Sequence, residues 1–135
     1  MAIWQVPFLL VKKEQGYAID SFLASLQTLS MHFPENPSWS NCLKQFGDIE
    51  STCLEISFED TDVIGEIELR VDIRSITLPQ LCAICEFARA NDLVLNYEGE
   101  VCEATTDKFL TILRSSNAYK FVKDPIRFIE QIEHK

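Results

Sequence analysis

The sequence predicts an α+β fold: a single domain, residues 1–135, in which a mostly antiparallel sheet of four to five strands has helices packed on one face. Two apolar runs, at residues 54–58 and 67–73, alternate with polar residues, as in strands that bury one face. The expected order is strand, helix, two strands, helix, one or two strands and two helices. A chain of 135 residues with 47% hydrophobic content is long enough to bury one core.

The first expected strand covers residues 2–12. Gly16 breaks it, and Asp20 or Ser21 can cap a helix. The apolar residues of that helix recur at spacings of three and four: Phe22, Leu23, Leu26 and Leu29. This helix must end before Pro34, because the following residues are dense in turn formers.

The loop after this helix contains Trp39, which either folds back on the core or is presented to a partner. A short helical turn is expected over residues 41–46, ended by Gly47. An antiparallel hairpin follows, in which Leu54, Ile56 and Phe58 face the core in the first strand. The second strand does the same with Ile67, Leu69, Val71 and Ile73. Residues 60–65 are expected to form the turn, and the outer face of the hairpin is expected to be acidic.

Residues 77–91 form the clearest helix. Thr77 and Gln80 have the spacing of a capping box, and Pro79 is tolerated in a first turn. Its expected apolar side consists of Leu78, Leu81, Cys82, Cys85 and Ala88, widened by Ile84 and Phe87.

Two short strands are expected next, at residues 93–97 and 100–102, joined by a turn at Glu98 and Gly99. Thr105 or Thr106 then caps a helix with Phe109, Leu110, Ile112 and Leu113 inward, and Asn117 is its expected stop. Asp124 followed by Pro125 predicts the start of a last helix.

Charge is concentrated in residues 48–72. This stretch holds nine acids against one base, Arg70, a net charge of −8 within a chain whose total is −9. Such a balance argues against direct binding of nucleic acid or of an anionic membrane, and it permits a basic protein as partner. No basic region precedes the N-terminal apolar run, which is too short to span a bilayer, so we expect a cytoplasmic protein. Its five cysteines are then expected to remain reduced.

The sequence favours a protein that is not an enzyme and that holds no metal or cofactor. Cys82 and Cys85 form a CxxC, but no second ligand pair accompanies it, and the pair lies mid-helix, so core cysteines are the better interpretation. The acidic run at residues 59–62 lacks the length and the flanking helices of an EF-hand. His32 and His134 are isolated, no GxSxG occurs, and four glycines make no phosphate cradle.

Paired carboxylates on an open strand face lack the cleft that catalysis needs, so they are either a solvated surface or a binding surface. A compact acidic domain suits the occlusion of a basic protein, because complementary potentials speed encounter. The residues expected to bind such a partner are Glu55, Glu59, Asp60, Asp62, Glu66, Glu68 and Asp72, with Trp39 as an aromatic anchor.

Two segments carry a resemblance to a family. Residues 71–74 read Val-Asp-Ile-Arg at a strand end, followed by the helix at 77–91 and by Ser-Asn-Ala-Tyr-Lys-Phe at 116–121. This pattern, which covers roughly the C-terminal half, resembles small bacterial immunity proteins of polymorphic toxin systems, including contact-dependent growth inhibition. The resemblance implies a cytoplasmic protein that binds and blocks a cognate toxin encoded beside it. It assigns no toxin-contacting residue, and the charge favours a nuclease.

Two other functions stay open. The first is a scaffold or binding module whose acidic face only confers solubility, which would tolerate charge reversal at Glu66 and Glu68. The second is a small enzyme with a hidden cleft, whose turnover would depend on one carboxylate or thiol.

Overall fold

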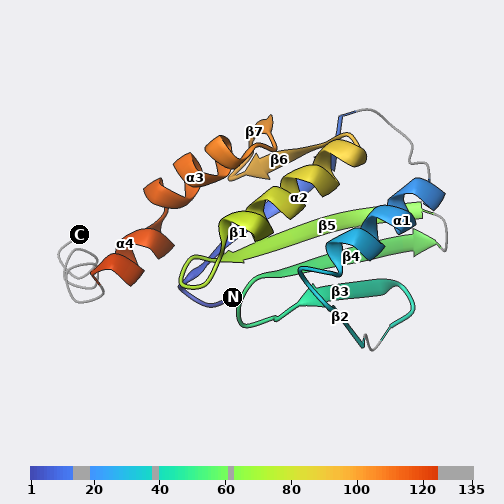
Figure 1. The fold of residues 1–135 in the computed structure, drawn as a ribbon, viewed down its shortest axis with the longest axis horizontal. Coiled ribbons are helices and arrows are strands. Elements are labelled where there is room, and N and C mark those ends of the chain that lie inside the picture. Colours follow the sequence, from blue (N-terminus) through green and yellow to red (C-terminus); the bar gives the residue numbers. More distant parts are fainter. Residues whose placement is uncertain (14–18, 38–39, 61–62, 125–135) are drawn as a thin grey trace.

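The computed structural model describes residues 1–13, 19–37, 40–60 and 63–124. These residues form four helices and one antiparallel sheet (Figure 1), so the predicted α+β class is confirmed. The sheet has seven strands rather than four to five. No helix within the described residues is long and apolar enough to cross a membrane.

The strands are β1 (Gln5–Lys12), β2 (Glu35–Asn36), β3 (Leu43–Gly47), β4 (Cys53–Asp60), β5 (Val63–Asp72), β6 (Leu93–Tyr97) and β7 (Glu100–Glu103). The helices are α1 (Ile19–Leu29), α2 (Leu78–Ala90), α3 (Thr106–Ser115) and α4 (Asn117–Lys123). In space the strands follow the order β2-β3-β4-β5-β1-β6-β7.

Strand β1 lies in the interior of the sheet, between β5 and β6. Gln5 lies opposite Asp72 of β5, and Leu9 lies opposite both Glu68 of β5 and Asn96 of β6. The N-terminal strand therefore joins a four-stranded meander, β2 to β5, to the β6–β7 hairpin. The sheet is continuous only because of this long-range pairing.

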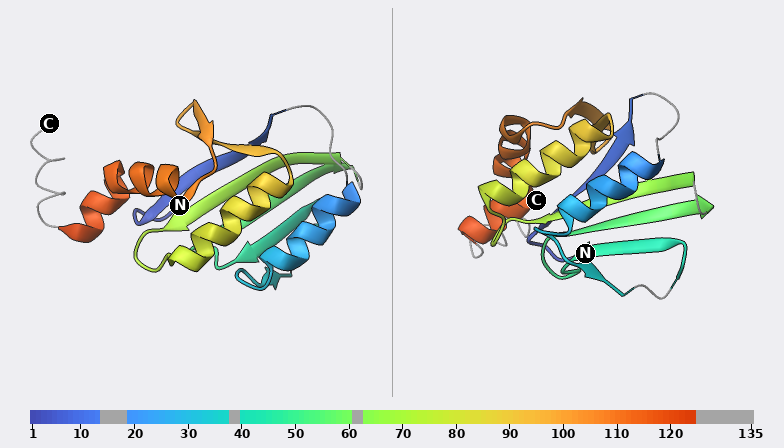
Figure 2. Two further views of the ribbon diagram at one scale, coloured as in Figure 1. Left: turned by 45° about the horizontal axis from the view of Figure 1, so that its top comes forward. Right: turned by 45° about the vertical axis from the view of Figure 1, so that its right-hand side comes forward.

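The fold has two layers, with the helices on one face of the sheet (Figure 2). The core lies between the layers and combines alternate residues of the strands with the apolar sides of the helices. Phe8 of β1 meets Phe109 of α3 edge to face, at 5.2 Å between ring centroids. Phe22 of α1 packs on Phe87 of α2 at 5.6 Å. No described helix covers the opposite face, which we call the open face.

The predicted core residues of the hairpin are confirmed. Leu54, Ile56, Ile67, Leu69 and Val71 are all buried on the helix side of β4 and β5, and Phe58 and Ile73 are partly buried. The turn is shorter than predicted, because Asp60 already pairs with Val63. Gly65, which was expected to end the turn, lies within β5.

The helical turn predicted over residues 41–46 is wrong. Residues from Leu43 to Gly47 form strand β3, in which Phe46 lies opposite the buried Leu54 of β4 and is itself buried. The sequence here has one strongly apolar core residue and no clear alternation, so its conformation is set by pairing with β4. The preceding loop also contains the two-residue strand β2, which pairs with Gln45 and Phe46.

Helix α2 begins with the predicted capping box. The Thr77 side chain accepts a hydrogen bond from the Gln80 backbone, and the Gln80 side chain accepts one from the Thr77 backbone. The buried side is rotated relative to the prediction and consists of Leu81, Ile84, Cys85, Phe87 and Ala88. Leu78 and Cys82 are exposed, because this helix covers the sheet with its Ile84 and Phe87 side.

Other elements differ in their limits. Strand β1 starts at Gln5, and α1 starts at Ile19 with Leu23 exposed on its outer side. The β6–β7 hairpin turns at Glu98 and Gly99 as predicted, both with positive φ.

Thr105 caps α3 as predicted, but Asn117 begins helix α4 instead of ending α3. Ser116 makes this possible, because it ends α3 and its hydroxyl accepts the Tyr119 amide at the start of α4. The helix predicted after Asp124 lies outside the described residues.

Candidate functional site

The open face brings together three of the predicted binding residues. Glu55 projects from β4, and Glu66 and Glu68 project from β5, all on the side away from the helices. Glu66 is exposed, and the other two are half-buried between neighbouring side chains. Around them lie partly buried apolar residues of other strands, Leu9 and Leu43. The open face therefore combines three acids with Arg70, with polar side chains such as Gln45 and with apolar ones.

Glu55 and Glu68 lie directly opposite each other across the β4–β5 pair. Like charges in this position destabilise a sheet. Glu68 is compensated by Arg70, whose Nε lies 2.9 Å from its Oε1. No described side chain donates a hydrogen bond to the Glu55 carboxylate. Arg70 also attracts Glu55, but it hydrogen-bonds to Glu68, so Glu55 is the half-buried acid of this face without a hydrogen-bonded cation.

Two β-bulges shape the end of the hairpin. Ser57 of β4 opposes two residues of β5, Gly65 and Glu66, and farther along the pairing shifts back by one residue on β4. The Ser57 hydroxyl accepts a hydrogen bond from the Glu66 amide and donates one to the Glu66 carbonyl. Beyond the bulges, Glu59 and Asp60 are exposed at the hairpin end, away from Glu55 and Glu68. Asp62 and Trp39 lie outside the described residues.

Asp72 was predicted to be an exposed binding residue, but it is buried, with 1% of its surface accessible. Its carboxylate accepts hydrogen bonds from the Arg74 side chain and backbone and from the Ser51 hydroxyl at 2.8 Å. Burial alone would raise the pKa of Asp72, but these hydrogen bonds outweigh it and lower the pKa. Arg74 also stacks on Trp4, 3.7 Å from the ring centroid. Asp72 is a structural residue.

The loop between β3 and β4 folds over one end of the open face. Gln5 donates hydrogen bonds to the carbonyls of Ile49 and Ser51, and the Trp4 indole donates to the Glu50 carbonyl at 2.9 Å. Gln5 is consequently buried. These contacts join β1 to a loop more than forty residues away, and they hold that loop against the sheet.

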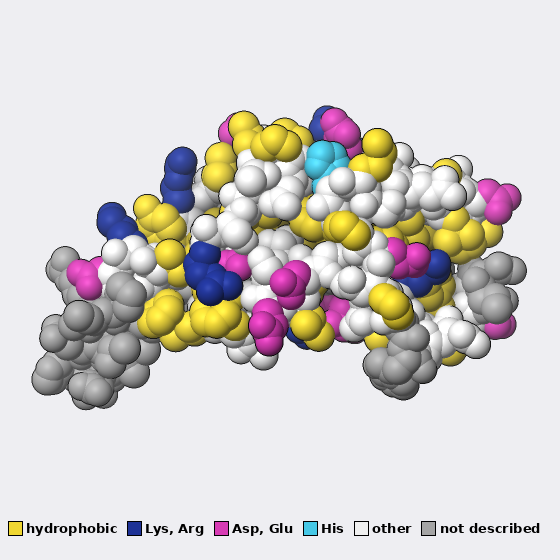
Figure 3. All heavy atoms as spheres, turned by 60° about the horizontal axis from the view of Figure 1, so that its bottom comes forward, with side chains coloured by type: hydrophobic (Ala, Val, Ile, Leu, Met, Phe, Trp, Pro, Cys, Tyr) yellow, Lys and Arg dark blue, Asp and Glu magenta, His cyan; other side chains and the backbone are white. Residues whose placement is uncertain are grey.

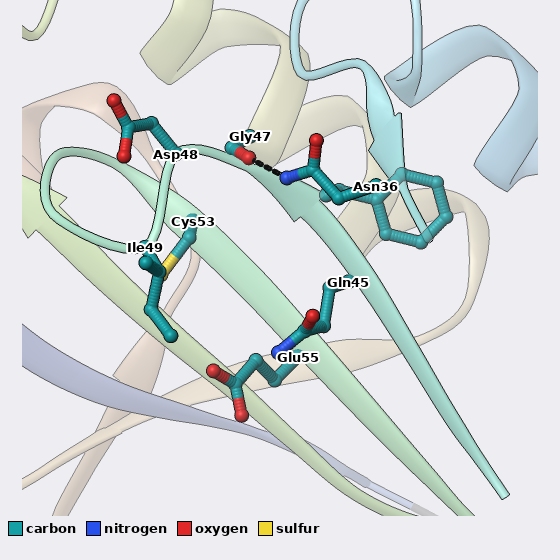
Figure 4. A pocket seen from close by; sticks show the side chains of 8 residues that line it. Asn36, Gln45, Gly47, Asp48, Ile49, Cys53 and Glu55 are labelled. Atoms are coloured by element: carbon teal, nitrogen blue, oxygen red, sulfur yellow. Dashed lines mark hydrogen bonds between the residues drawn. The ribbon is translucent and has the colours of Figure 1, made fainter. Parts of the chain in front are cut away.

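A hollow lies between this loop and the open face (Figure 4). Its volume is about 450 Å³, and its lining consists of Asn36, Gln45, Phe46, Gly47, Asp48, Ile49, Cys53 and Glu55. Figure 4 shows Gln45 and Glu55 side by side on neighbouring strands, with Ile49 and Cys53 at the end of the hollow nearer the β3–β4 loop. The lining includes two carboxylates and no Lys or Arg. Sequence reasoning did not find this hollow, because it depends on how the β3–β4 loop returns over the sheet.

Elsewhere the surface is mixed in charge. On the face seen in Figure 3, acidic and basic side chains are interspersed among hydrophobic and uncharged ones. A second hollow, of about 490 Å³ between α1 and β3, has an ion pair at its rim, with Lys44 Nζ 3.2 Å from Glu35 Oε1. The two opposite charges at that rim therefore neutralise each other.

The thiols separate into buried and exposed groups. Cys85 is buried in the core as predicted for the CxxC, whereas Cys82 is exposed on the outer side of α2, so the core interpretation is wrong for it. Burial raises the pKa of both Cys53 and Cys85 to about 11. Among the described residues, no three His, Cys, Asp or Glu side chains gather as metal ligands.

Comparisons with known proteins gave no match to a family model, to a curated protein or to a solved structure.

Proposed function

We propose that this protein is an inhibitor that docks a basic protein on its open face, and that its partner is a cognate bacterial toxin of the nuclease type. The observation that supports this proposal is the grouping of Glu55, Glu66 and Glu68 on the face that no described helix covers. The resemblance to immunity proteins, at residues 71–74, 77–91 and 116–121, supplies the toxin as the specific partner.

The open face has the chemistry of a docking surface. The three carboxylates project from paired strands, so the backbone that carries them is already ordered before a partner binds. Their potential steers a cationic partner and raises the association rate. The apolar side chains beside them, such as Leu9, Leu43 and the exposed Val101, offer area that a partner can bury. Trp39 stays a predicted anchor, and Glu59 and Asp60 lie at the margin of the surface.

Asp72 no longer belongs to the binding set, since Arg74 and Ser51 already satisfy its carboxylate. The electrostatic part of the proposal therefore depends on Glu55, Glu66 and Glu68.

The test begins with capture of the protein encoded beside this one, by co-expression with the tagged chain. Replacing Glu55, Glu66 and Glu68 by Lys changes the net charge from −9 to −3. We expect the affinity for that protein to fall at least tenfold and its salt dependence to weaken, because the three acids no longer attract the partner's cations. Calorimetry at two salt concentrations gives both quantities.

The matched control reverses three exposed acids outside the open face, Glu86, Glu100 and Asp107. It makes the same change in net charge and should bind almost normally. Equal losses in the two variants, or no loss in the open-face variant, would contradict docking on this face. Binding without loss of the partner's toxicity would identify a scaffold module instead of an inhibitor.

A further inference from the structure

We infer that the hollow beside Glu55 receives an arginine side chain of the docked partner. This inference rests on the proposed function, and it names the position at which the partner is anchored. It starts from Glu55, a half-buried carboxylate of the open face that accepts no hydrogen bond from a described side chain, while Arg70 hydrogen-bonds to Glu68.

The lining of the hollow suits a guanidinium group on an alkyl stem. Glu55 supplies a carboxylate, and Gln45 beside it supplies an amide oxygen as a second acceptor. Ile49, which is 54% exposed, supplies apolar surface for the stem. A planar fork of five donors can satisfy a carboxylate and a neighbouring amide at once, which a compact ammonium group does less well.

Charge selects the same class of ligand. The hollow is lined by the carboxylates of Asp48 and Glu55 and by no Lys or Arg. Asp48 Oδ1 already accepts the Glu50 amide at 2.9 Å and shapes the loop, so Glu55 is the acid free to bind. Glu68 lies opposite Glu55 and carries the same charge, and Arg70, which attracts both acids, is hydrogen-bonded to Glu68. An entering cation would relieve the repulsion between Glu55 and Glu68.

The hollow exists before any partner binds. Its outer wall, the loop at residues 48–51, is held by the hydrogen bonds from Gln5 and Trp4. Its upper edge is held by Asn36, which donates to the Gly47 carbonyl, and by the Gly47 amide, which donates to Pro34 at 2.8 Å. These contacts keep Ile49 at the rim with 54% of its surface exposed, although it is apolar. A volume of about 450 Å³ lies within the usual range of ligand pockets, ~300–1,000 Å³.

The probe for this inference is a blocked Gly-Arg-Gly peptide, compared with the same peptide carrying citrulline. Citrulline has the shape of arginine and no charge. Titration into the labelled protein, followed by amide chemical shifts, should give saturable changes at Gly47, Ile49 and Glu55 and at the Gln45 side-chain amide. Under the same conditions the citrulline peptide should give none, because the carboxylate attracts only the cation.

Two isosteric variants distinguish binding of the peptide at a defined site from a general electrostatic attraction to the acids of the surface. Glu55→Gln removes the charge at the hollow and should weaken binding of the arginine peptide about tenfold. Glu100→Gln removes the same charge from an exposed acid outside the open face and outside the lining, and it should change the affinity less than twofold. Equal weakening by both variants, or shift changes spread over all acids, would overturn the inference.

Experiments with the whole partner distinguish failure of the arginine inference from failure of docking on the open face. If the triple reversal abolishes partner binding while Glu55→Gln leaves the affinity unchanged, the open face docks the partner and the arginine inference fails. If the peptide occupies the hollow but the triple reversal does not affect the partner, docking on the open face fails and the hollow binds a guanidinium ligand of another kind.

Discussion

At the scale of single residues, Asp72 shows how position outweighs sequence pattern. It lies in the polar phase of the β5 alternation, which places it on the open face, yet the β3–β4 loop covers it there. Ser51 of that loop bonds to the Asp72 carboxylate and is held in place by Gln5 of β1, and nothing in the local sequence around Ser51 reveals this contact. The alternation therefore identifies which face a residue occupies, but not whether that face is covered.

We expect Asp72→Asn to lower the free energy of unfolding at pH 7 by about 1–3 kcal/mol, because it removes the charge that Arg74 and Ser51 stabilise. A lowered pKa means that this stabilisation is present above the unfolded-state value, about pH 4, and is lost as pH falls through the folded-state value. Wild type should consequently lose more stability than the Asn variant between pH 5 and acid unfolding, on the order of the same difference. Urea unfolding at several pH values measures this, with Glu86→Gln as the exposed control. Parallel pH profiles for wild type and Asp72→Asn would contradict the expectation.

The cysteines permit a second test at this scale. At about pH 8, alkylation should modify the exposed Cys42 and Cys82 first, while Cys53 and Cys85 stay protected because burial raises their pKa to about 11. Peptide mapping of the modified protein identifies the order. Since the pKa values are raised, the stabilisation by the neutral buried thiols is present below the unfolded-state pKa and is lost as pH rises toward 11. Fast modification of Cys53 would show that the β3–β4 loop does not cover it in solution.

At the scale of elements, two helix caps and one turn were predictable, whereas the start of α1, the stop at Asn117 and the weak strand β3 were not. Thr77, Thr105 and the Glu98–Gly99 turn carry local signals that do not depend on the rest of the chain. Strand β3 carries no such signal, because its conformation depends on pairing with β4. The strongly alternating strands of the hairpin were recognised for the same local reason. Three of the predicted binding acids lie together on the open face. The hollow beside them was not predicted, because it depends on the path of the β3–β4 loop.

Gly47 is the residue that starts this loop, and its replacement tests the loop's role. Its φ is +83°, and a Cβ there would collide with the Thr52 carbonyl oxygen, so Gly47→Ala must displace the backbone. Gly99 has a similar φ of +86° with nothing near a Cβ, so Gly99→Ala serves as the control and should cost only about 1–2 kcal/mol. We expect Gly47→Ala to cost clearly more in urea unfolding and to weaken binding of the arginine peptide. Equal costs for the two variants would contradict a tight loop.

At the scale of the whole molecule, the sheet is held together by β1. The pairing of β1 with β5 and β6 joins residues more than fifty positions apart, so it adds strongly to the nonlocal contacts that slow folding. The sequence order of strands and helices predicted the α+β class, but it could not place β1 in the interior, since the pairing partners of a strand are not encoded in its own residues.

Native-state hydrogen exchange tests this arrangement. Amides of β5 and β1, each paired on both sides, should exchange most slowly, near the rate set by global unfolding. Those of β7, at one edge of the sheet and paired only with β6, should exchange faster by local opening. Protection of β7 equal to that of β5 would contradict the strand order.

The two-layer arrangement has an evolutionary consequence. Along β4, Leu54 and Ile56 build the interior, while Glu55 and Ser57 between them face outward. Substitutions at the second set can change what the surface recognises without creating a cavity among the first. Interior packing and surface chemistry are thus written in alternating letters of one strand, so the outward-facing letters can change while the architecture is kept.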